Sequence, residues 1–215
     1  MILTNHITVP KTARYFTSGN LNEHTTEIWI VIHGYAQLAS DFIKEFTPLF
    51  SKERYFLAPE GLNRFYAKGF GGKPAATWMT SEDREYEILD YSNYLETMFN
   101  QVVPLDYSGK IFILGFSQGV ATASRWLNAS QKRFDLFMLC SGDIAMELRN
   151  PISKALLQIP CVYITGNNDP FLDAQKTNEI HLFMKEINAR TIYFDGGHQI
   201  DIPSILKGIS VPFNL

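Results

Sequence analysis

Ser117 stands in a sequence pattern that predicts a nucleophile. It occupies the centre of residues 115–119, which read Gly-Phe-Ser-Gln-Gly and fit the pattern G-x-S-x-G. An apolar run precedes this pattern and a stretch of small residues follows it, so the serine falls on a turn from a strand to a helix. Such a turn holds the hydroxyl above a sheet, and the flanking glycines leave room for neighbouring backbone. The alternative is a glycine-rich turn with an incidental serine.

Two histidines follow Ser117, and one of them suits the role of its general base. A serine hydroxyl is a poor nucleophile until a base takes its proton. His181 lies inside a helical pattern, whereas His198 follows the last apolar run in a glycine-rich loop. A loop at that place can carry the imidazole over the nucleophile, so we predict that His198 is the base.

The base needs a carboxylate to orient it, and three aspartates compete for that role. Asp169 follows an apolar run that ends at residue 164, and Pro170 restricts the turn after it. The order serine, acid, histidine is the order expected with this type of turn. We predict Asp169 as the acid, and Asp143, which follows the preceding run, stays open as an alternative. Asp173 is better explained as a helix cap.

Acyl transfer also needs two backbone N–H groups that stabilise the negative oxygen of a tetrahedral intermediate. One is expected from Gln118, the residue after the nucleophile. The other is expected from residues 33–37, which follow the first buried run. Gly34 permits a close approach of the backbone there, which leaves the N–H of Tyr35 as the second donor. His33 is expected to brace this loop through a side-chain hydrogen bond.

The elements that must position these residues alternate along the chain. Six short runs are apolar at nearly every position, as expected for strands that are covered on both faces: residues 28–32, 55–58, 111–114, 136–139, 162–164 and 191–194. Helical spacing of apolar residues follows in three of the intervals: 42–50, 91–102 and 180–187. Residues 80–83 fit a capping box, and residues 7–9 and 13–17 fit an edge hairpin. The pattern predicts one α/β domain over residues 1–215, with a mostly parallel central sheet and helices on both faces.

Composition supports a single soluble globular domain. The chain has 215 residues, 46% of them hydrophobic and 19% charged. Its 19 Lys and Arg against 22 Asp and Glu give a net charge of −3, without the basic footprint of a nucleic-acid-binding protein. No apolar run reaches the ~18 residues of a membrane span. The first residues lack the features of a secretory signal. We therefore expect a cytoplasmic protein without integral membrane association.

The two cysteines, Cys140 and Cys161, predict neither a disulfide nor a zinc site. One ends an apolar run and the other begins the next, so in parallel neighbouring strands they lie at opposite ends. A disulfide needs Cα atoms within about 7 Å of each other. We expect two free, buried thiols, and no metal or cofactor.

These motifs together resemble the α/β-hydrolase superfamily, and within it the small phospholipase/carboxylesterase-type serine esterases. The resemblance covers about residues 25–210 and includes Ile32-His33-Gly34, residues 115–119, residues 166–169 and Gly197-His198. The five residues at the serine are identical to a form common in that family, G-F-S-Q-G. Residues 33–37 depart from the family's usual H-G-L-G-D, and such departures also suit a branch near the dienelactone hydrolase-like or fungal serine hydrolases.

The resemblance implies hydrolysis of a small carboxylic ester through an acyl-enzyme, without a cofactor. Thioester or lysophospholipid hydrolysis and peptide cleavage on the same triad stay open, as does a non-catalytic binding protein on the same fold. Trp78 resembles a tryptophan that the family places beside its substrate cleft. Phe70 and Met79 lie in the same irregular stretch, residues 59–82, and are predicted to line that cleft with it. The sequence leaves no room for a cap domain, which favours short-chain esters, and it leaves open whether the chain forms a homodimer.

Overall fold

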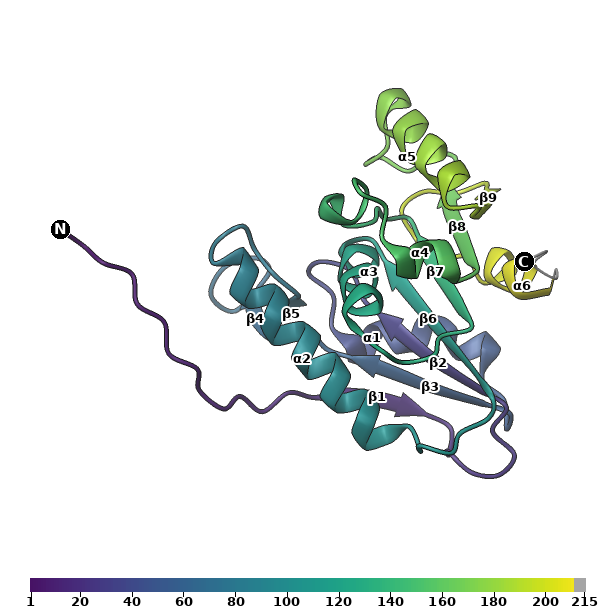
Figure 1. Cartoon of the computed structure of the whole chain (residues 1–215), viewed down its shortest axis with the longest axis horizontal. Coiled ribbons are helices and arrows are strands. Elements are labelled where there is room, and N and C mark those ends of the chain that lie inside the picture. Colours follow the sequence, from purple (N-terminus) through teal and green to yellow (C-terminus); the bar gives the residue numbers. More distant parts are fainter. Residues whose placement is uncertain (211–215) are drawn as a thin grey trace.

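The computed structural model describes residues 1–210, and its centre is a seven-stranded sheet (Figure 1). The last five residues of the predicted domain, 211–215, lie outside the described residues. The strands are β1 (Tyr15–Ser18), β2 (Glu27–Ile32), β3 (Arg54–Pro59), β6 (Lys110–Phe116), β7 (Leu136–Cys140), β8 (Cys161–Gly166) and β9 (Arg190–Phe194). Their order is β1-β3-β2-β6-β7-β8-β9. β1 is antiparallel to β3, and the other neighbouring pairs are parallel.

All six predicted strands are present, and burial on both faces explains their apolar sequences. In β2, Ile28, Ile30 and Ile32 point into one core, whereas Trp29 and Val31 point into the other. All five side chains are fully buried. Side chains alternate between the two faces of a strand, so a strand that is covered on both sides must be apolar at every position.

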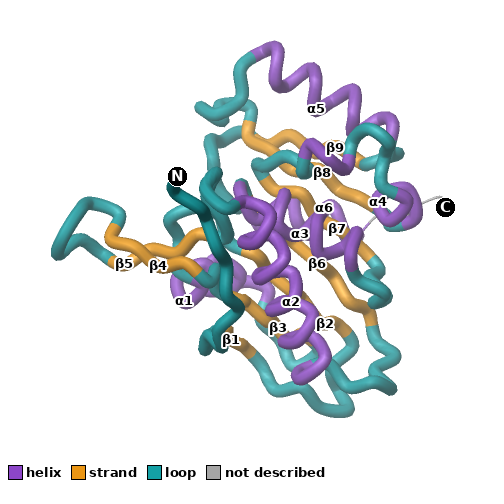
Figure 2. The backbone as a smooth tube through the Cα atoms, turned by 60° about the vertical axis from the view of Figure 1, so that its left-hand side comes forward, coloured by secondary structure: helices purple, strands orange, loops and turns teal. Residues whose placement is uncertain are grey.

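Helices cover both faces of the sheet (Figure 2). On the face of Ile28 lie α2 (Arg84–Val102), α3 (Gln118–Ala129), α4 (Lys154–Gln158) and α5 (Ala174–Glu186). On the face of Trp29 lie α1 (Ala39–Phe42), the 3-10 helix η1 (Ile43–Leu49) and α6 (Ile202–Ser210). Between β7 and β8 the chain forms only the short 3-10 helix η2 (Met146–Leu148) and α4. No cap domain is inserted there, as predicted.

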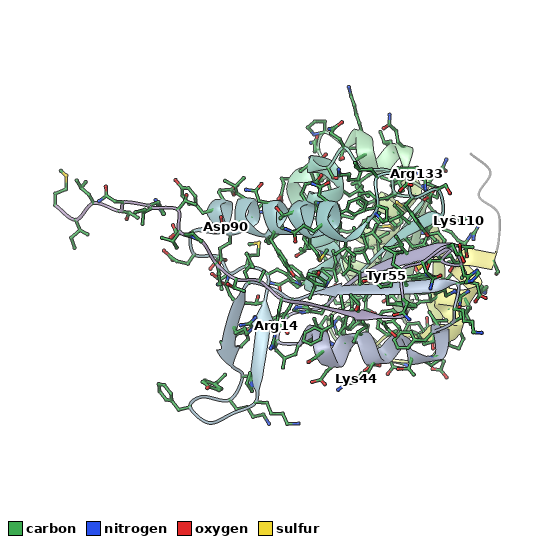
Figure 3. All side chains as sticks on the ribbon, turned by 90° about the horizontal axis from the view of Figure 1, so that it is seen from below. Arg14, Lys44, Tyr55, Asp90, Lys110 and Arg133 are labelled. Atoms are coloured by element: carbon green, nitrogen blue, oxygen red, sulfur yellow. The ribbon has the colours of Figure 1, made fainter. Side chains whose placement is uncertain are left out.

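Residues 59–82 are more regular than the sequence indicated. They contain β4 (Asn63–Tyr66) and β5 (Pro74–Thr77), which pair as an antiparallel hairpin and form a separate two-stranded sheet. The hairpin projects from the body of the molecule (Figures 2 and 3). Its strands are short, and the side chains of β4 are exposed or only half-buried. The apolar periodicity that reveals core strands is therefore missing from its sequence.

Two further predictions about local structure are corrected. Residues 7–9 form no strand, and β1 pairs with β3 rather than with a hairpin partner. The capping box at residues 80–83 is absent: Asp83 caps α2 in a left-handed conformation (φ 46°) without a side-chain cap bond. Glu87, in the first turn, instead accepts a hydrogen bond from the Thr80 N–H. The predicted cap of α5 is confirmed, because the Asp173 carboxylate accepts from the Lys176 N–H at 2.7 Å.

Cys140 and Cys161 are free and buried, as predicted. In the parallel register Cys161 lies beside Phe137 and Cys140 lies beside Ile164. The two cysteines are therefore offset by three positions along the strands, roughly 10 Å at ~3.3 Å per residue, which is too far for a disulfide. Within residues 1–210, no helix is both long enough and apolar enough to cross a membrane.

Candidate active site

Ser117 lies on a strained turn between β6 and α3. Its backbone has φ 53° and ψ −121°, a conformation that residues other than glycine rarely adopt. The flanking glycines are sterically required. A Cβ on Gly115 would lie 2.5 Å from the Gly119 carbonyl oxygen, and a Cβ on Gly119 would lie 2.2 Å from that of Ile32. The sequence folds this way because the helix packs directly against the strands beneath it, and the turn lifts Ser117 to the carboxyl edge of the sheet.

His198 and Asp169 form a hydrogen-bonded pair at the same edge. The His198 Nδ1 and the Asp169 Oδ2 are 2.8 Å apart, and the carboxylate is buried. An ionised carboxylate only accepts hydrogen bonds, so Nδ1 carries the proton and Nε2 keeps a free lone pair. The imidazole lies between two rings: its centroid is 4.9 Å from that of Phe116 and 4.6 Å from that of Phe171.

Backbone contacts hold the loops of Asp169 and His198 together. The Asn167 N–H donates to the Phe194 carbonyl at 2.9 Å, and the Asn168 N–H donates to the Gly196 carbonyl at 2.9 Å. A Cβ on Gly166 would lie 2.2 Å from the Gly196 carbonyl oxygen, so the two loops meet without intervening side chains. The position of the imidazole therefore rests on the pairing of β8 with β9.

The alternatives to these residues have other partners. Asp143 forms ion pairs with Arg149 and, at 2.6 Å, with Lys176. Asp173 caps α5. His181 lies within α5 rather than on the loop after β9 that carries His198. The structure thus brings Asp169, and not Asp143, to the histidine.

His33 braces the backbone of the loop after β2, as the sequence predicted. Its Nε2 accepts from the Gly61 N–H at 3.0 Å, and its Nδ1 lies 2.7 Å from the Gly34 carbonyl oxygen. An acceptor at Nε2 leaves the proton on Nδ1, which donates to that carbonyl. The Gly34 carbonyl and the Tyr35 N–H belong to one trans peptide and point in opposite directions, so this bond also orients the Tyr35 N–H. A Cβ on Gly34 would lie 3.1 Å from the Ser117 Cβ, which places this backbone beside the serine.

Glu60 is a buried acidic residue that the sequence analysis did not single out, and it precedes Gly61, which donates to His33. Its carboxylate accepts from the Nε atoms of Arg14 and Arg64, each at 2.7 Å, and from the Ala39 N–H at 3.3 Å. The label in Figure 3 marks Arg14 near the base of the hairpin. The spacing of four between Glu60 and Arg64 was the only available signal, because Arg14 is distant in sequence.

The three residues predicted to contact substrate take different positions. Trp78 is only 1% exposed, and its indole N–H donates to the His33 carbonyl at 2.8 Å. It supports the loop from within the core, whereas the sequence predicted a position that lines the substrate cleft. Phe70 is fully exposed on the projecting hairpin loop, where neighbouring Gly69 has no atom within 4 Å of an added Cβ. Met79 is half-buried and accepts from the Gln118 side-chain amide at 2.9 Å through its carbonyl. Substrate contact by Phe70 and Met79 stays a prediction.

Among the described residues, no group of three or more His, Cys, Asp or Glu side chains could hold a metal ion. At this edge the Ser117 turn lies beside Gly34, and Phe116, the residue before Ser117, contacts the imidazole of His198. Such an arrangement can activate a hydroxyl and stabilise a negative oxygen.

The neutral form of His33 makes the stability of the protein depend on pH. Burial lowers the pKa of His33 from 6.5 to about 4. A lowered pKa means that the folded state binds the proton of His33 less tightly than the unfolded state does. Neutral His33 therefore contributes its full stabilisation of the folded state above pH 6.5, and this contribution is lost as the pH falls towards 4. We expect the free energy of unfolding in urea to drop by on the order of 3 kcal/mol over this range because of His33. A His33→Asn variant should be less stable at pH 7 but lose less on acidification, and equal pH slopes would contradict the assignment.

A curated relative shares part of the sequence. The chain is 27% identical to the esterase OVCA2 of Mus musculus over 140 residues, which are 60% of this chain and 61% of that protein. The match thus spans less than two thirds of the mouse protein.

Two solved structures share the fold. The acyl-protein thioesterase 2 of Zea mays superposes with a TM-score of 0.69 at 18% identity, covering 91% of this chain and 96% of the other. A phospholipase/carboxylesterase of Dyadobacter fermentans superposes with a TM-score of 0.61 at 16% identity, covering 93% and 96%. The fold is the α/β-hydrolase fold, as the resemblance implied.

A model of one protein family matches most of the chain. Described as serine hydrolase (FSH1), it covers residues 29–204, which include Ser117, Asp169 and His198. The chain therefore belongs to the serine hydrolase (FSH1) family.

Proposed function

We propose that the protein hydrolyses carboxylic esters through an acyl-enzyme on Ser117, with His198 as the general base and Asp169 as the orienting acid. The observation that carries this proposal is the 2.8 Å hydrogen bond between Asp169 and His198 at the edge where the strained turn presents Ser117. Membership of a serine hydrolase family supports a reaction at a serine.

In the first half of the reaction, the His198 Nε2 takes the proton from the Ser117 hydroxyl as the oxygen attacks the ester carbonyl. The negative oxygen of the tetrahedral intermediate accepts hydrogen bonds from the backbone N–H groups of Tyr35 and Gln118. The Gln118 N–H begins α3, where a helix has no internal acceptor for its first N–H groups. The intermediate collapses when His198 gives its proton to the leaving alcohol.

In the second half, His198 takes a proton from water, and the resulting hydroxide attacks the acyl-enzyme. The second tetrahedral intermediate uses the same two N–H donors. It collapses to the acid as His198 returns the proton to Ser117. Asp169 holds the imidazole in the required tautomer throughout and stabilises its charged form. Apart from the ester itself these steps consume only water, and they need neither a metal nor a cofactor.

We propose short-chain esters as the substrate class. The absence of an inserted cap between β7 and β8 supports an open site. Two exposed rings lie in this region: that of Phe171 contacts His198, and that of Tyr35, the residue after Gly34, packs on Phe65 of the hairpin. Each offers a flat apolar surface to a small acyl or alcohol group. The similarity to an acyl-protein thioesterase makes thioesters the second substrate class to test.

A fluorophosphonate probe tests the nucleophile directly. We expect the wild-type protein to be labelled and the Ser117→Ala variant to remain unlabelled, because the probe reacts only with an activated serine. Ser117→Ala and His198→Ala should each lower kcat on a four-carbon ester by roughly 10⁴-fold to 10⁶-fold, and the double variant should lose little more. Labelling of Ser117→Ala, or additive losses in the double variant, would contradict the shared mechanism.

The acid is tested by a matched pair of substitutions. Asp169→Asn keeps the shape of the side chain but removes the charge that selects the His198 tautomer, so kcat should fall by about 10³-fold to 10⁴-fold with little change in KM. Asp143→Asn serves as the control, since Asp143 is paired with Arg149 and Lys176. A larger loss from Asp143→Asn than from Asp169→Asn would reverse the assignment.

Chain-length preference is measured with p-nitrophenyl esters of two to sixteen carbons, with a thioester and an anilide of the preferred acyl group alongside. An open site without a cap buries few methylene groups, and each buried methylene adds about 0.8 kcal/mol of binding. We expect kcat/KM to be highest at about two to eight carbons. A steady rise of kcat/KM up to sixteen carbons would refute the short-chain proposal. A higher kcat/KM on the thioester than on the matching ester would make thioesters the preferred substrate class.

A further inference from the structure

Residues 76–79, here termed the bridging segment, join the two loops that carry the proposed oxyanion donors. The segment runs from the end of β5 towards α2. On one side lies the loop of His33 and Tyr35, and on the other lies the turn of Ser117 and Gln118. These loops are about 80 residues apart in sequence, as read from the positions of Tyr35 and Gln118, and neighbouring strands carry them: β2 and β6.

Three hydrogen bonds attach the bridging segment to the first loop. The Ala36 N–H donates to the Ala76 carbonyl at 2.9 Å, and the Ala76 N–H donates to the Gln37 carbonyl at 3.1 Å. The indole N–H of Trp78 donates to the His33 carbonyl at 2.8 Å. The same indole packs on the imidazole of His33, with ring centroids 5.0 Å apart.

The side chain of Gln118 attaches the bridging segment to the second loop. Its Oε1 accepts from the Trp78 N–H at 3.2 Å and lies 3.0 Å from the Thr77 hydroxyl. Its Nε2 donates to the Met79 carbonyl at 2.9 Å. The amide thus meets both a donor and an acceptor of one backbone stretch, which fixes the orientation of the whole residue.

These attachments are well shielded from solvent. Ala76, Thr77 and Trp78 are all buried. Hydrogen bonds in such surroundings are stronger than at a wet surface, and a buried partner left unpaired is costly. The indole N–H of Trp78 and the side-chain amide of Gln118 are engaged within the protein, so these groups hold the loops rather than a substrate.

We propose that the bridging segment, through Trp78 and Gln118, sets the separation of the two oxyanion donors. Both are positioning residues: Trp78 acts through the His33 carbonyl on the peptide of Tyr35, and Gln118 acts through its side chain on its own backbone N–H. This inference rests on the proposed esterase function and adds to it the element that assembles the oxyanion hole. An error of about 1 Å in such a position costs on the order of 10²-fold in rate.

Trp78→Phe and Gln118→Met test the proposal, because each removes the hydrogen bonds while retaining most of the side-chain volume. We expect kcat on a four-carbon ester to fall roughly tenfold to a hundredfold in each variant, with KM within about twofold of wild type. A trifluoromethyl ketone forms an oxyanion when Ser117 adds to it, so its affinity should weaken by the same factor as kcat/KM. Thr77→Val provides a third, milder variant should Trp78→Phe not fold.

Trp126→Phe is the matched control. Trp126 is equally buried, and its indole N–H also donates to an acceptor, the Glu96 carboxylate at 3.0 Å, but it lies on α3 outside the bridging segment. We expect this variant to lose stability and keep its kcat. Folded Trp78→Phe and Gln118→Met with wild-type kcat, or with a raised KM alone, would overturn the proposal. A wild-type protein that neither turns over esters nor binds the ketone would contradict the proposed function and this inference together, whereas an active wild type with unaffected variants contradicts only the inference.

Discussion

Parallel pairing of neighbouring strands is the constraint on which both the core and the site depend. It buries β2, β6, β7 and β8 on both faces, and it brings their carboxyl ends to one edge. Ser117 follows β6, Asp169 follows β8 and His198 follows β9, so residues far apart in sequence meet there. The hydrogen bonds that align the strands therefore also fix where the proposed nucleophile, acid and base lie relative to one another.

The sequence was informative wherever a position is determined by its immediate neighbours. The apolar runs revealed the strands of the sheet, since burial on both faces leaves no polar position within them. Glycines around Ser117 revealed the turn, because the backbone there has no space for a Cβ. A glycine-rich loop after the last run revealed His198, although its partner had to be chosen from three aspartates, and Asp169 was chosen because it follows the apolar run before the last.

Positions that depend on distant partners were not predictable. The sequence placed Trp78 in an irregular stretch beside a substrate cleft, but its indole N–H donates to the His33 carbonyl, 45 positions earlier in the chain. Glu60 is one acidic residue among several cations in the sequence, yet Arg14, 46 positions earlier, forms an ion pair with its buried carboxylate. Burying a carboxylate is unfavourable unless such partners are present, and no pattern in the residues around Glu60 predicts that Arg14 is one of them.

The projecting hairpin of β4 and β5 also bears on how this fold can vary. Its outer loop contributes no residue to either core cluster, and β4 and β5 form a two-stranded sheet of their own. Doubling the length of a flexible loop costs only about 0.6 kcal/mol in closure entropy, so insertions at the tip would scarcely disturb folding. The inner end of the same hairpin is anchored to the loop of Tyr35 through Ala76. Relatives could therefore lengthen the tip into a new recognition surface without moving the base of the hairpin or the loop of Tyr35 that is attached to it.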